Sequence, residues 1–343
     1  MGYRIGSFNL FKLNYQSDKE IKKDFQKIAQ IIKDNNIDIL AIQEVLTENA
    51  AKRLTNELGR NYAYKWAQPK RNGATAHQLE GYAFIWNTRR IELVHDENIE
   101  NPRIYDNYHL LPGKKEIAKQ VRLARDPFYG RFQPKALPRV EFRIINTHII
   151  FSKNNEIDKK EDESNLQKGD IYYRKNEFEL LTKSIYREIA KNPKNNKVLY
   201  TILTGDYNLS LVNYPQLHLN PIQVEDMKLV TVQREKTSLK QPPSGDNPEK
   251  LAKFQKGITS LDDCYAHDYD HFTYDTNRFE GIEVQYDRIN TLGKHTATGS
   301  HFEKLQEHRT TISDHVPIFF DIELNPPAII LFHNQTGEKN GII

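Results

Sequence analysis

The sequence has 343 residues, in which 49 lysines and arginines against 46 aspartates and glutamates give a formal net charge of +3. This balance excludes a strongly basic protein, so any surface for an anionic partner has to be local. The single cysteine, Cys264, excludes an intramolecular disulfide, and the chain holds no apolar run of about eighteen residues that would predict a transmembrane helix.

The chain is longer than an average domain, but large α/β sandwiches and barrels form a single unit of this size. We therefore expect one folded domain over residues 1–325 and a tail over residues 326–343. Charged or proline-rich stretches predict long loops at about residues 101–137, 152–175 and 234–262. No charged and apolar leader precedes the first strand, so we expect a soluble monomer that is cytoplasmic, or secreted if a signal peptide was removed.

The first elements in chain order are a strand, a helix and a second strand. Arg4–Leu10 has the apolar pattern of a short strand with Asn9 at its carboxyl end, and apolar residues recur at helical spacing over residues 18–34. Ile37–Val45 then predicts a strand that contains Glu44. The two strands of such a unit are parallel, so Asn9 and Glu44 should meet at one edge of a sheet. A glutamate in so apolar a strand needs a partner, either a metal ion or a neighbouring lysine.

The later elements follow from the same spacing rules. They are, in order, a helix at Glu48–Leu58, strands at Tyr82–Trp86, Arg89–Val94 and Arg139–Ile150, a helix from Phe178 to Ile189, and strands at Val198–Leu203, Tyr269–Tyr274, Glu283–Leu292 and Ile312–Ile322. Three polar residues stand beside predicted strands or turns: Glu80, Arg125 and His148. Taken singly, each has an ordinary alternative, as an exposed loop residue or as a histidine satisfied in the core.

The stretch from Val198 to Asn208 is an apolar strand that stops at a glycine followed by two short polar acceptors. Asp206 and Asn208 lie two positions apart on an extended chain and therefore project to the same side. Together they can bind one phosphate, water or metal ion. The alternative is a turn in which both side chains bond their own backbone.

Five short motifs occur in order along the chain. They are Ser7-Phe8-Asn9, Gln43-Glu44, Asn146-Thr147-His148, Gly205-Asp206-Tyr207-Asn208 and Ser313-Asp314-His315. In order and spacing this series resembles the endonuclease/exonuclease/phosphatase superfamily, over about residues 4 to 324. The resemblance implies a two-sheet, four-layer α/β/β/α sandwich and a Mg²⁺-dependent phosphodiester hydrolase.

Within that superfamily the chain looks most like the deoxyribonuclease I branch. Arg125-Asp126-Pro127-Phe128 is similar to the Arg-Glu-Pro segment of that branch, and Glu80 stands where the branch has a glutamate behind its first catalytic histidine. The branch implies an endonuclease whose partner is DNA and whose products carry 5′-phosphate and 3′-hydroxyl ends. Two residues depart from it: Leu46 replaces an arginine that reaches the minor groove, and Gln78 replaces a stacking tyrosine.

The resemblance also implies which residues bind the metal ion and the substrate phosphate. Asn9, Glu44 and Asp314 would bind Mg²⁺, or alternatively Mn²⁺ or Ca²⁺, because hard oxygen ligands suit these ions. Arg125 would bind one phosphate oxygen through its planar guanidinium, and Asn208 would bind another.

The catalytic roles implied by the resemblance fall to two histidines, three acidic residues and Asn208, which would act together with Asp206. His148, supported by Glu80, and His315, supported by Asp270, would act as general base and general acid near neutral pH. Asp206 would orient the attacking water. Each supporting carboxylate would fix the tautomer of its histidine and raise the pKa of the imidazole.

Several alternatives stay open. Asp287, in a Tyr-Asp-Arg-Ile string, competes with Asp270 as the support of His315, although Asp270 fits the layout better because a further strand follows it. Phosphatases and phosphodiesterases of small or lipid phosphoesters share the core motifs, and a binding module with a relic site is a third class. Phosphate contacts are expected from residues 103–131 and from the loop at 152–175. The residues do not tell duplex DNA from single strands or RNA, nor which histidine is the acid.

Overall fold

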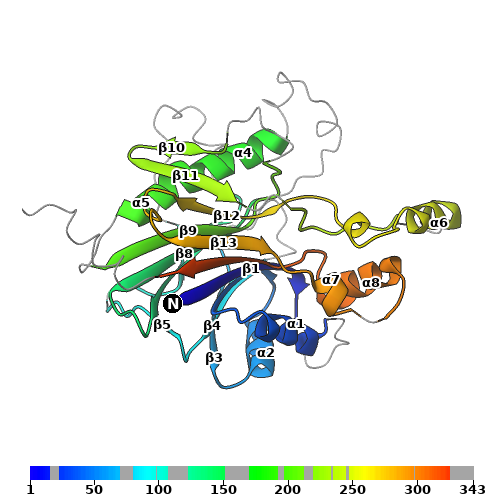
Figure 1. The fold of residues 1–343 in the computed structure, drawn as a ribbon, viewed down its shortest axis with the longest axis horizontal. Helices are drawn as coiled ribbons and strands as arrows, with labels where there is room; N and C mark the ends of the chain where they lie inside the picture. Colours follow the sequence, from blue (N-terminus) through cyan, green and yellow to red (C-terminus); the bar gives the residue numbers. More distant parts are fainter. Residues whose placement is uncertain are drawn as a thin grey trace, which may run out of the picture.

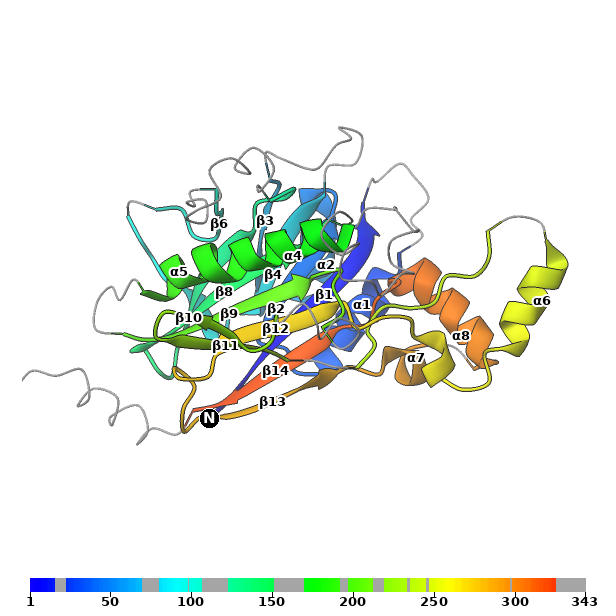
Figure 2. The same ribbon diagram turned by 90° about the horizontal axis from the view of Figure 1, so that it is seen from above.

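The computed structural model describes residues 1–15, 23–69, 80–97, 99–106, 123–150, 170–191, 197–211, 219–232, 235–244, 247–296 and 298–324. Two β-sheets pack face to face and helices cover both outer faces, so the molecule has four layers (Figures 1 and 2). This architecture confirms the α/β/β/α sandwich that the motif series implies.

The first sheet has six strands. The order is β13 (Glu283–Arg288), β14 (Ile318–Glu323), β1 (Gly2–Leu13), β2 (Ile39–Val45), β4 (Gly81–Asn87) and β3 (Tyr62–Ala67). β1 lies parallel to β2 and antiparallel to β14, so the first strand is a neighbour of the last one. Helices α1 (Phe25–Asp34) and α2 (Glu48–Leu58) cover the outer face (Figure 1).

The sequence accounts for the unit of β1, α1 and β2 directly. Asp24 caps α1, because its side chain accepts a hydrogen bond from the backbone N–H of Lys27. The apolar residues of α1 lie on one face and are buried; they are Phe25, Ile28, Ala29, Ile31 and Ile32. β1 and β2 pair in parallel register up to Asn9, which lies opposite Gln43, and this confirms the predicted parallel pair.

The second sheet has eight strands. The order is β10 (Ile222–Val224), β11 (Met227–Val232), β12 (Asp270–Asp275), β9 (Val198–Asp206), β8 (Val140–His148), β7 (Phe128–Pro134) and β5 (Ile91–Leu93), while β6 (Arg103–Ile104) pairs with β7. Its central strands β8 and β9 are parallel. Helix α4 (Asp170–Leu180), a π-helical segment (Leu181–Tyr186) and α5 (Arg187–Lys191) cover its outer face (Figure 2).

Shorter helical elements gather at one end of the sandwich. They are α6 (Pro248–Lys256), a 3₁₀ turn (Asp262–Cys264), α7 (Thr291–Lys294), α8 (His301–Glu307) and a π-helical segment (His308–Ile312). Figure 1 shows α6, α7 and α8 together at the right of the molecule. None of the helices in the described ranges is long and apolar enough to cross a membrane.

Aromatic side chains fill the space between the sheets. The ring of Phe84 stacks on that of Phe128 at a centroid distance of 4.9 Å, and Phe132 meets Phe84 edge-on at 5.2 Å. All three side chains are fully buried, and such aromatic pairs add about 0.5–1.5 kcal/mol each beyond their burial. This core fixes the two sheets against each other, and with them the strand ends that carry the polar motifs.

The predicted loop over residues 101–137 is wrong for its second part. Strand β7 occupies Phe128–Pro134, and Phe128 and Phe132 lie in the core between the sheets. The charge of Arg131 suggested a loop, but its guanidinium is buried and binds the carboxylate of Glu141 at 2.8 and 3.1 Å. Arg131 is therefore a structural residue and not a phosphate contact. Residues 107–122 lie outside the described residues.

The predicted loop over residues 234–262 is wrong for its middle part. Helix α6 occupies Pro248–Lys256, where the Asn247 side chain accepts a hydrogen bond from the N–H of Lys250. Charges and prolines are loop signals, but proline at the first helical position after an asparagine cap is also a helix start. The loop prediction took only the first meaning into account and therefore missed helix α6.

The third predicted loop, residues 152–175, overlaps helix α4, which begins at Asp170. Residues 151–169 lie outside the described part of the chain. The same holds for the predicted tail over residues 326–343 and for Gln78, the expected departure from a stacking tyrosine.

Predicted strands are in the right places but shift at their ends. The strand predicted for Glu283–Leu292 ends at Arg288, since helix α7 follows it. The strand predicted for Ile312–Ile322 begins at Ile318, since a π-helical segment precedes it. Strands β3, β10 and β11 were not predicted; they lie at or next to sheet edges.

Gly205 lies where β9 meets β8 most closely. Its φ is +141°, and a Cβ there would lie 1.9 Å from the carbonyl oxygen of Thr147. We expect Gly205→Ala to lower the free energy of unfolding by about 2–4 kcal/mol, because two paired backbones would have to separate. Urea unfolding measures this. Gly257→Ala is the control, since Gly257 has φ −80° and its nearest contact would be 3.3 Å away; equal losses in both variants would refute the argument.

Candidate active site

Two parallel strand pairs bring their polar ends together at one edge of the sandwich. β1 and β2 of the first sheet carry Asn9 and Glu44, and β8 and β9 of the second sheet end at His148 and Asp206. The side chains meet across the two sheets, because Asn9 Nδ2 donates a hydrogen bond to Asp206 Oδ2 at 3.0 Å. Parallel pairing in each sheet thus explains why residues far apart in the sequence converge.

The backbone beyond Asn9 holds two predicted metal ligands. Asn9 Nδ2 donates to Glu44 Oε1 at 3.1 Å. The N–H of Phe11 donates to Asn9 Oδ1 at 2.9 Å, and the N–H of Lys12 donates to Glu44 Oε2 at 3.1 Å. Phe11 and Lys12 have φ values of +39° and +56°, and this left-handed turn aims both N–H groups at the ligand oxygens. This turn could not be predicted from the amino-acid pattern, since neither residue is a glycine or an asparagine.

Unfavourable backbone angles gather at this edge. Six non-glycine residues in the described part of the chain have positive φ, and four of them are Phe11, Lys12, Glu44 and Asn208. Each such residue costs about 1–3 kcal/mol. Strain concentrated in this way is typical of functional sites, because the surrounding fold has to impose it.

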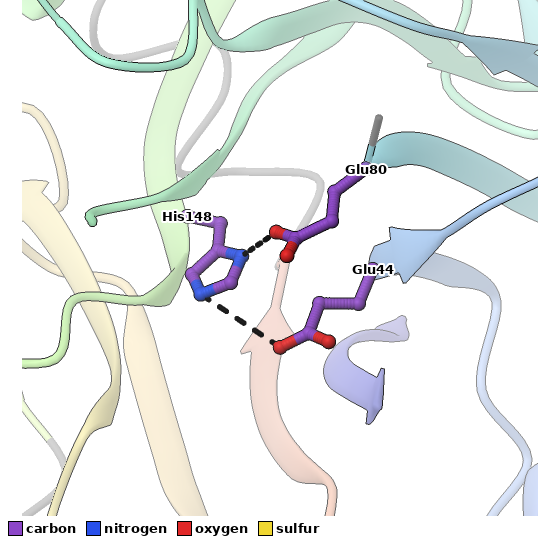
Figure 3. Close-up of side chains that lie close together, drawn as sticks. All are labelled: Glu44, Glu80 and His148. Atoms are coloured by element: carbon purple, nitrogen blue, oxygen red, sulfur yellow. Dashed lines mark ion pairs between the residues drawn. The ribbon is translucent and has the colours of Figure 1, made fainter. Parts of the chain in front are cut away.

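His148 lies beside the carboxylates of Glu44 and Glu80 (Figure 3) and beside that of Asp206 in the second sheet. Its Nδ1 is 3.2 Å from Glu80 Oε2, and its Nε2 is 3.9 Å from Glu44 Oε1 and 3.7 Å from Asp206 Oδ2. Burial lowers the pKa of His148, and so does the guanidinium of Arg125. The three carboxylates outweigh both effects, so the pKa of His148 is raised above its usual value.

Arg125 and Glu80 form an ion pair beside His148. Arg125 Nη2 is 2.7 Å from Glu80 Oε2, the oxygen that also faces His148 Nδ1. Burial alone would raise the pKa of Glu80, but the His148 ring and the Arg125 guanidinium lower it below its usual value. Glu80 is thus a carboxylate shared by the Arg125 guanidinium and the His148 ring. Arg125 Nε is buried and has no hydrogen-bond partner among the described residues.

The second histidine, His315, binds a different carboxylate. His315 Nδ1 donates to Asp270 Oδ2 at 2.7 Å, and its Nε2 lies 3.6 Å from Asp206 Oδ2. Burial lowers the pKa of His315, but the charges of Asp270 and Asp206 outweigh it and raise the pKa well above its usual value. Asp287 is exposed on β13, where it accepts from the N–H of Arg288. The structure therefore places Asp270, and not Asp287, beside His315.

Asp206 lies at the centre of these groups. Its Oδ2 faces the Nε2 atoms of both histidines, at 3.7 Å from His148 and 3.6 Å from His315. Its Oδ1 accepts from the N–H of Asn208 at 2.8 Å, so the self-bonded turn considered as an alternative is also present. Asn208 Nδ2 donates in turn to Ile149 O at 2.8 Å. One oxygen of Asp206 shapes the turn, and the other faces the site.

Asp314 is the third predicted metal ligand. Its Oδ1 is buried without a hydrogen-bond partner among the described residues, and its Oδ2 is 3.6 Å from Arg309 Nη2. Burial raises the pKa of Glu44, and the negative charges of Glu80 and Asp314 raise it further. The carboxylates of Glu44 and Asp314 are hard donors whose negative charge is only partly neutralised, and the amide oxygen of Asn9, which accepts from the N–H of Phe11, is a neutral hard donor. The residues present therefore fit a divalent cation such as Mg²⁺.

Two groups of side chains in the described ranges bring three ligand atoms within 4.8 Å of one another. One is Glu44, Glu80 and His148, and the other is Asp206, Asp270 and His315. Each contains one of the histidines described above. Mg²⁺ prefers oxygen ligands to histidine nitrogen, so both groups differ from the ligand set predicted for it, which is Asn9, Glu44 and Asp314.

The other polar motif residues join the two sheets beneath the site. Gln43 Nε2 donates to Asn146 Oδ1 at 2.7 Å and to Ser7 Oγ at 3.1 Å. Asn146 Nδ2 donates to Ile42 O at 3.0 Å. All three polar side chains are fully buried, where hydrogen-bonded polar groups are tolerated. They support the site and do not line it, a distinction that the motif pattern alone does not reveal.

The raised pKa of His315 predicts how stability depends on pH. A histidine whose pKa is higher in the folded chain stabilises the fold fully below the unfolded pKa of about 6.5, and this stabilisation is lost as the pH rises through the folded pKa. We therefore expect the melting temperature to fall toward alkaline pH more steeply in the wild type than in Asp270→Asn, which lacks the carboxylate that raises the pKa. Scanning fluorimetry across the neutral and alkaline range measures both curves; parallel curves would contradict a charged His315.

No protein-family model matches the sequence, and no curated protein matches it either. Solved structures do match the fold. An endonuclease/exonuclease/phosphatase from Bacteroides vulgatus has 16% identity and a TM-score of 0.53, over 95% of this chain and 100% of its own. A mannosyl-6-phosphatase from Bacteroides thetaiotaomicron has 15% identity and a TM-score of 0.53, over 94% of this chain and 100% of its own. TDP2 from D. rerio, complexed with single strand DNA product, has 10% identity and a TM-score of 0.51, over 94% of this chain and 99% of its own.

At these identities the comparison shows the fold alone. The fold implied by the motif series is confirmed, since these similar structures include proteins described as endonuclease/exonuclease/phosphatase. One similar structure is a mannosyl-6-phosphatase and another holds a DNA product, so the fold does not decide the substrate. The substrate has to be argued from the site.

Proposed function

We propose that this chain is a Mg²⁺-dependent phosphodiester hydrolase of the endonuclease/exonuclease/phosphatase superfamily, and that it cleaves DNA to leave 5′-phosphate and 3′-hydroxyl ends. One observation carries the proposal: two histidines, each next to a carboxylate, face the same oxygen of Asp206 beside buried acidic residues. Hydrolysis of a phosphodiester needs one group that takes a proton from water and another that returns a proton to the leaving oxygen. The two histidines offer both.

The chain's own groups would orient the reactants and move the protons. Asp206 Oδ2 would orient the attacking water, because it lies between the two Nε2 atoms. His148 and His315 would share the roles of general base and general acid, since each has a carboxylate at Nδ1 that leaves Nε2 toward the site. Their raised pKa values favour the protonated form, so the ring that serves as general base has to lose its proton before the reaction.

The metal ion and the phosphate would occupy neighbouring positions. Asn9, Glu44 and Asp314 would hold Mg²⁺, which when bound neutralises charge that develops on the phosphate and its leaving oxygen. Asn208 would bind one phosphate oxygen and Arg125 another. The ion pair of Arg125 with Glu80 at 2.7 Å supports this role, because the guanidinium is oriented before a substrate arrives.

Two observations support DNA as the substrate. The segment from Arg125 to Phe128 resembles the Arg-Glu-Pro segment of the deoxyribonuclease I branch. A protein of the same fold, D. rerio TDP2, was solved with single strand DNA product. Neither distinguishes duplex from single-stranded DNA.

The second candidate is a phosphatase or phosphodiesterase for a small-molecule phosphoester. It is favoured by the mannosyl-6-phosphatase, which matches this fold at a TM-score of 0.53. Leu46 also favours this second candidate, because the deoxyribonuclease I branch has an arginine at that position that reaches the minor groove of DNA. Both candidates would use the same histidines and carboxylates.

Nicking of supercoiled plasmid distinguishes the two candidates. With Mg²⁺ at low salt we expect nicked circles, and with EDTA none. Nicking should weaken with salt, because each phosphate neutralised by the protein contributes a slope of about −0.9 to log affinity against log salt. Nicks that a ligase seals directly would show 5′-phosphate and 3′-hydroxyl ends. Intact plasmid together with phosphate release from a sugar phosphate would overturn the DNA proposal and support the second candidate.

A further inference from the structure

Glu177 is a buried acidic residue of helix α4 that the proposed reaction does not use. It is only 7% exposed. Its Oε1 accepts a hydrogen bond from the N–H of Ala124 at 2.5 Å, and its Oε2 accepts one from the N–H of Ile150 at 3.2 Å. A single carboxylate thus joins the segment before β7 to the segment after β8.

Both of these segments carry predicted site residues. Ala124 directly precedes Arg125, and Ile150 follows His148 by two positions. The side chains of Arg125 and His148 meet at Glu80, at 2.7 and 3.2 Å. Glu177 therefore holds the backbone near these two residues, whereas Glu80 holds their side chains.

Arg174 makes a related contact one helical turn earlier. It lies three positions before Glu177, so both side chains leave α4 on the same face. Arg174 is buried, and its Nη1 donates to Asn208 O at 2.8 Å. Asn208 Nδ2 donates in turn to Ile149 O at 2.8 Å. Charged groups of α4 therefore bind the backbone at three places, each at or beside a predicted site residue.

Packing alone does not account for Glu177. Elsewhere α4 covers the sheet with apolar side chains, such as Ile171 and Phe178. A carboxylate is costly in this position: burial raises the pKa of Glu177 to about 7, although its two N–H donors lower it. The N–H groups of Ala124 and Ile150 do require an acceptor, because they lie outside β7 and β8, beyond the reach of the strand ladders.

We propose that Glu177 is a positioning residue, which holds Arg125 and His148 at the separation that the substrate phosphate requires, with helix α4 as its rigid support. The inference rests on the proposed function and deepens it, because it identifies what places the phosphate-binding residue. Glu177 does not touch the substrate. Its effect has to pass through the backbone to Arg125 and His148.

Glu177→Gln is the test variant, because glutamine keeps the shape of the side chain but replaces one acceptor oxygen with an NH₂ group. One backbone N–H then loses its acceptor. We expect KM for an oligonucleotide substrate to rise about tenfold and kcat to fall less, since small misplacements of binding groups have large effects. Glu179→Gln is the matched control on the same helix. Glu179 pairs with Lys183 at 2.8 Å, and its replacement should leave both constants unchanged.

A double-mutant cycle separates positioning from general stability. If Glu177 acts through Arg125, Glu177→Gln should raise KM about tenfold in the wild type but less than about twofold in an Arg125→Ala background. Equal fold-changes in the two backgrounds would overturn the inference and make Glu177 a structural residue only. If Glu177→Gln does not fold, Glu177→Asp takes its place, because the shorter side chain keeps the charge but cannot reach both N–H groups.

Titration with inorganic phosphate keeps the inference apart from the proposed function, because binding needs no turnover. We expect Glu177→Gln to weaken phosphate binding about tenfold in the wild type and not in Arg125→Ala. Unchanged binding, or a wild type that binds no phosphate, would overturn the inference. A wild type that binds phosphate and loses affinity in Glu177→Gln, yet cleaves no nucleic acid, would support the inference and overturn only the proposed function.

Discussion

Replacing His148 by alanine should lower kcat for phosphodiester cleavage by about 10²- to 10⁴-fold, which is the contribution of a general acid or base. The ring is held by Glu80 at Nδ1, and its Nε2 faces Glu44 and Asp206. Alanine removes the group that exchanges the proton and leaves the phosphate-binding residues in place. KM should therefore change little. Initial rates on a labelled oligonucleotide at saturating Mg²⁺ measure both constants.

Three further variants make this test specific. His95→Ala removes an exposed histidine from the chain after β5 and should keep full activity. His315→Ala should have an effect similar to that of His148→Ala. The double variant should lose far less than the product of the two factors, because both histidines serve one reaction. A folded His148→Ala variant with kcat within about threefold of the wild type would contradict the assigned role.

The second large effect is expected at the metal site. Replacing Glu44 by glutamine should lower kcat/KM by about 10²-fold or more, because the amide keeps the shape but not the charge that holds Mg²⁺. In the wild type Mg²⁺ should also raise the melting temperature, since an ion bound only to the folded chain stabilises it. The Glu44→Gln variant should lose this shift. Thermal melts with Mg²⁺ and with EDTA measure it without reference to activity.

The melts also show whether Glu44 is a ligand or only part of the fold. In EDTA the Glu44→Gln variant gives the reference melt: the amide removes a buried charge but leaves either Asn9 Nδ2 or the N–H of Lys12 without its acceptor, so only the shift caused by Mg²⁺ is compared. Glu92→Gln, at an exposed position of β5, should leave the Mg²⁺ shift unchanged. A full Mg²⁺ shift in Glu44→Gln would contradict the assignment and point to the group of Asp206, Asp270 and His315.

The sequence predicts those parts of the fold and site that depend on local patterns. Apolar spacing marks β1, α1 and β2, and the rule for such units makes the strands parallel. Polar residues at strand ends then have to converge. Asn9 and Asp206 illustrate this, because they are 197 positions apart and yet form a hydrogen bond at 3.0 Å.

Pairing between distant charged groups has no such local pattern. Arg131 was predicted to be a cation of a surface loop, because the sequence does not show that its partner is Glu141, ten positions away on β8. In the sequence Glu177 resembles any glutamate of a surface helix. Only the fold shows that its side chain is buried against the segments next to β7 and β8. The role of the backbone amides of Phe11 and Lys12 could not be predicted either, because neither residue type favours the left-handed turn that aims these amides at Asn9 and Glu44.

The pairing of β1 with β14 ties the order of synthesis to the completion of the site. Asn9 belongs to β1, whereas Asp314 and His315 immediately precede β14, and Ser313 Oγ donates to Asn9 O at 2.6 Å across 304 positions. A nascent chain whose residues 313–315 are still inside the ribosome lacks the second histidine and a metal ligand. The site is therefore complete only after nearly all of the described chain has emerged from the ribosome.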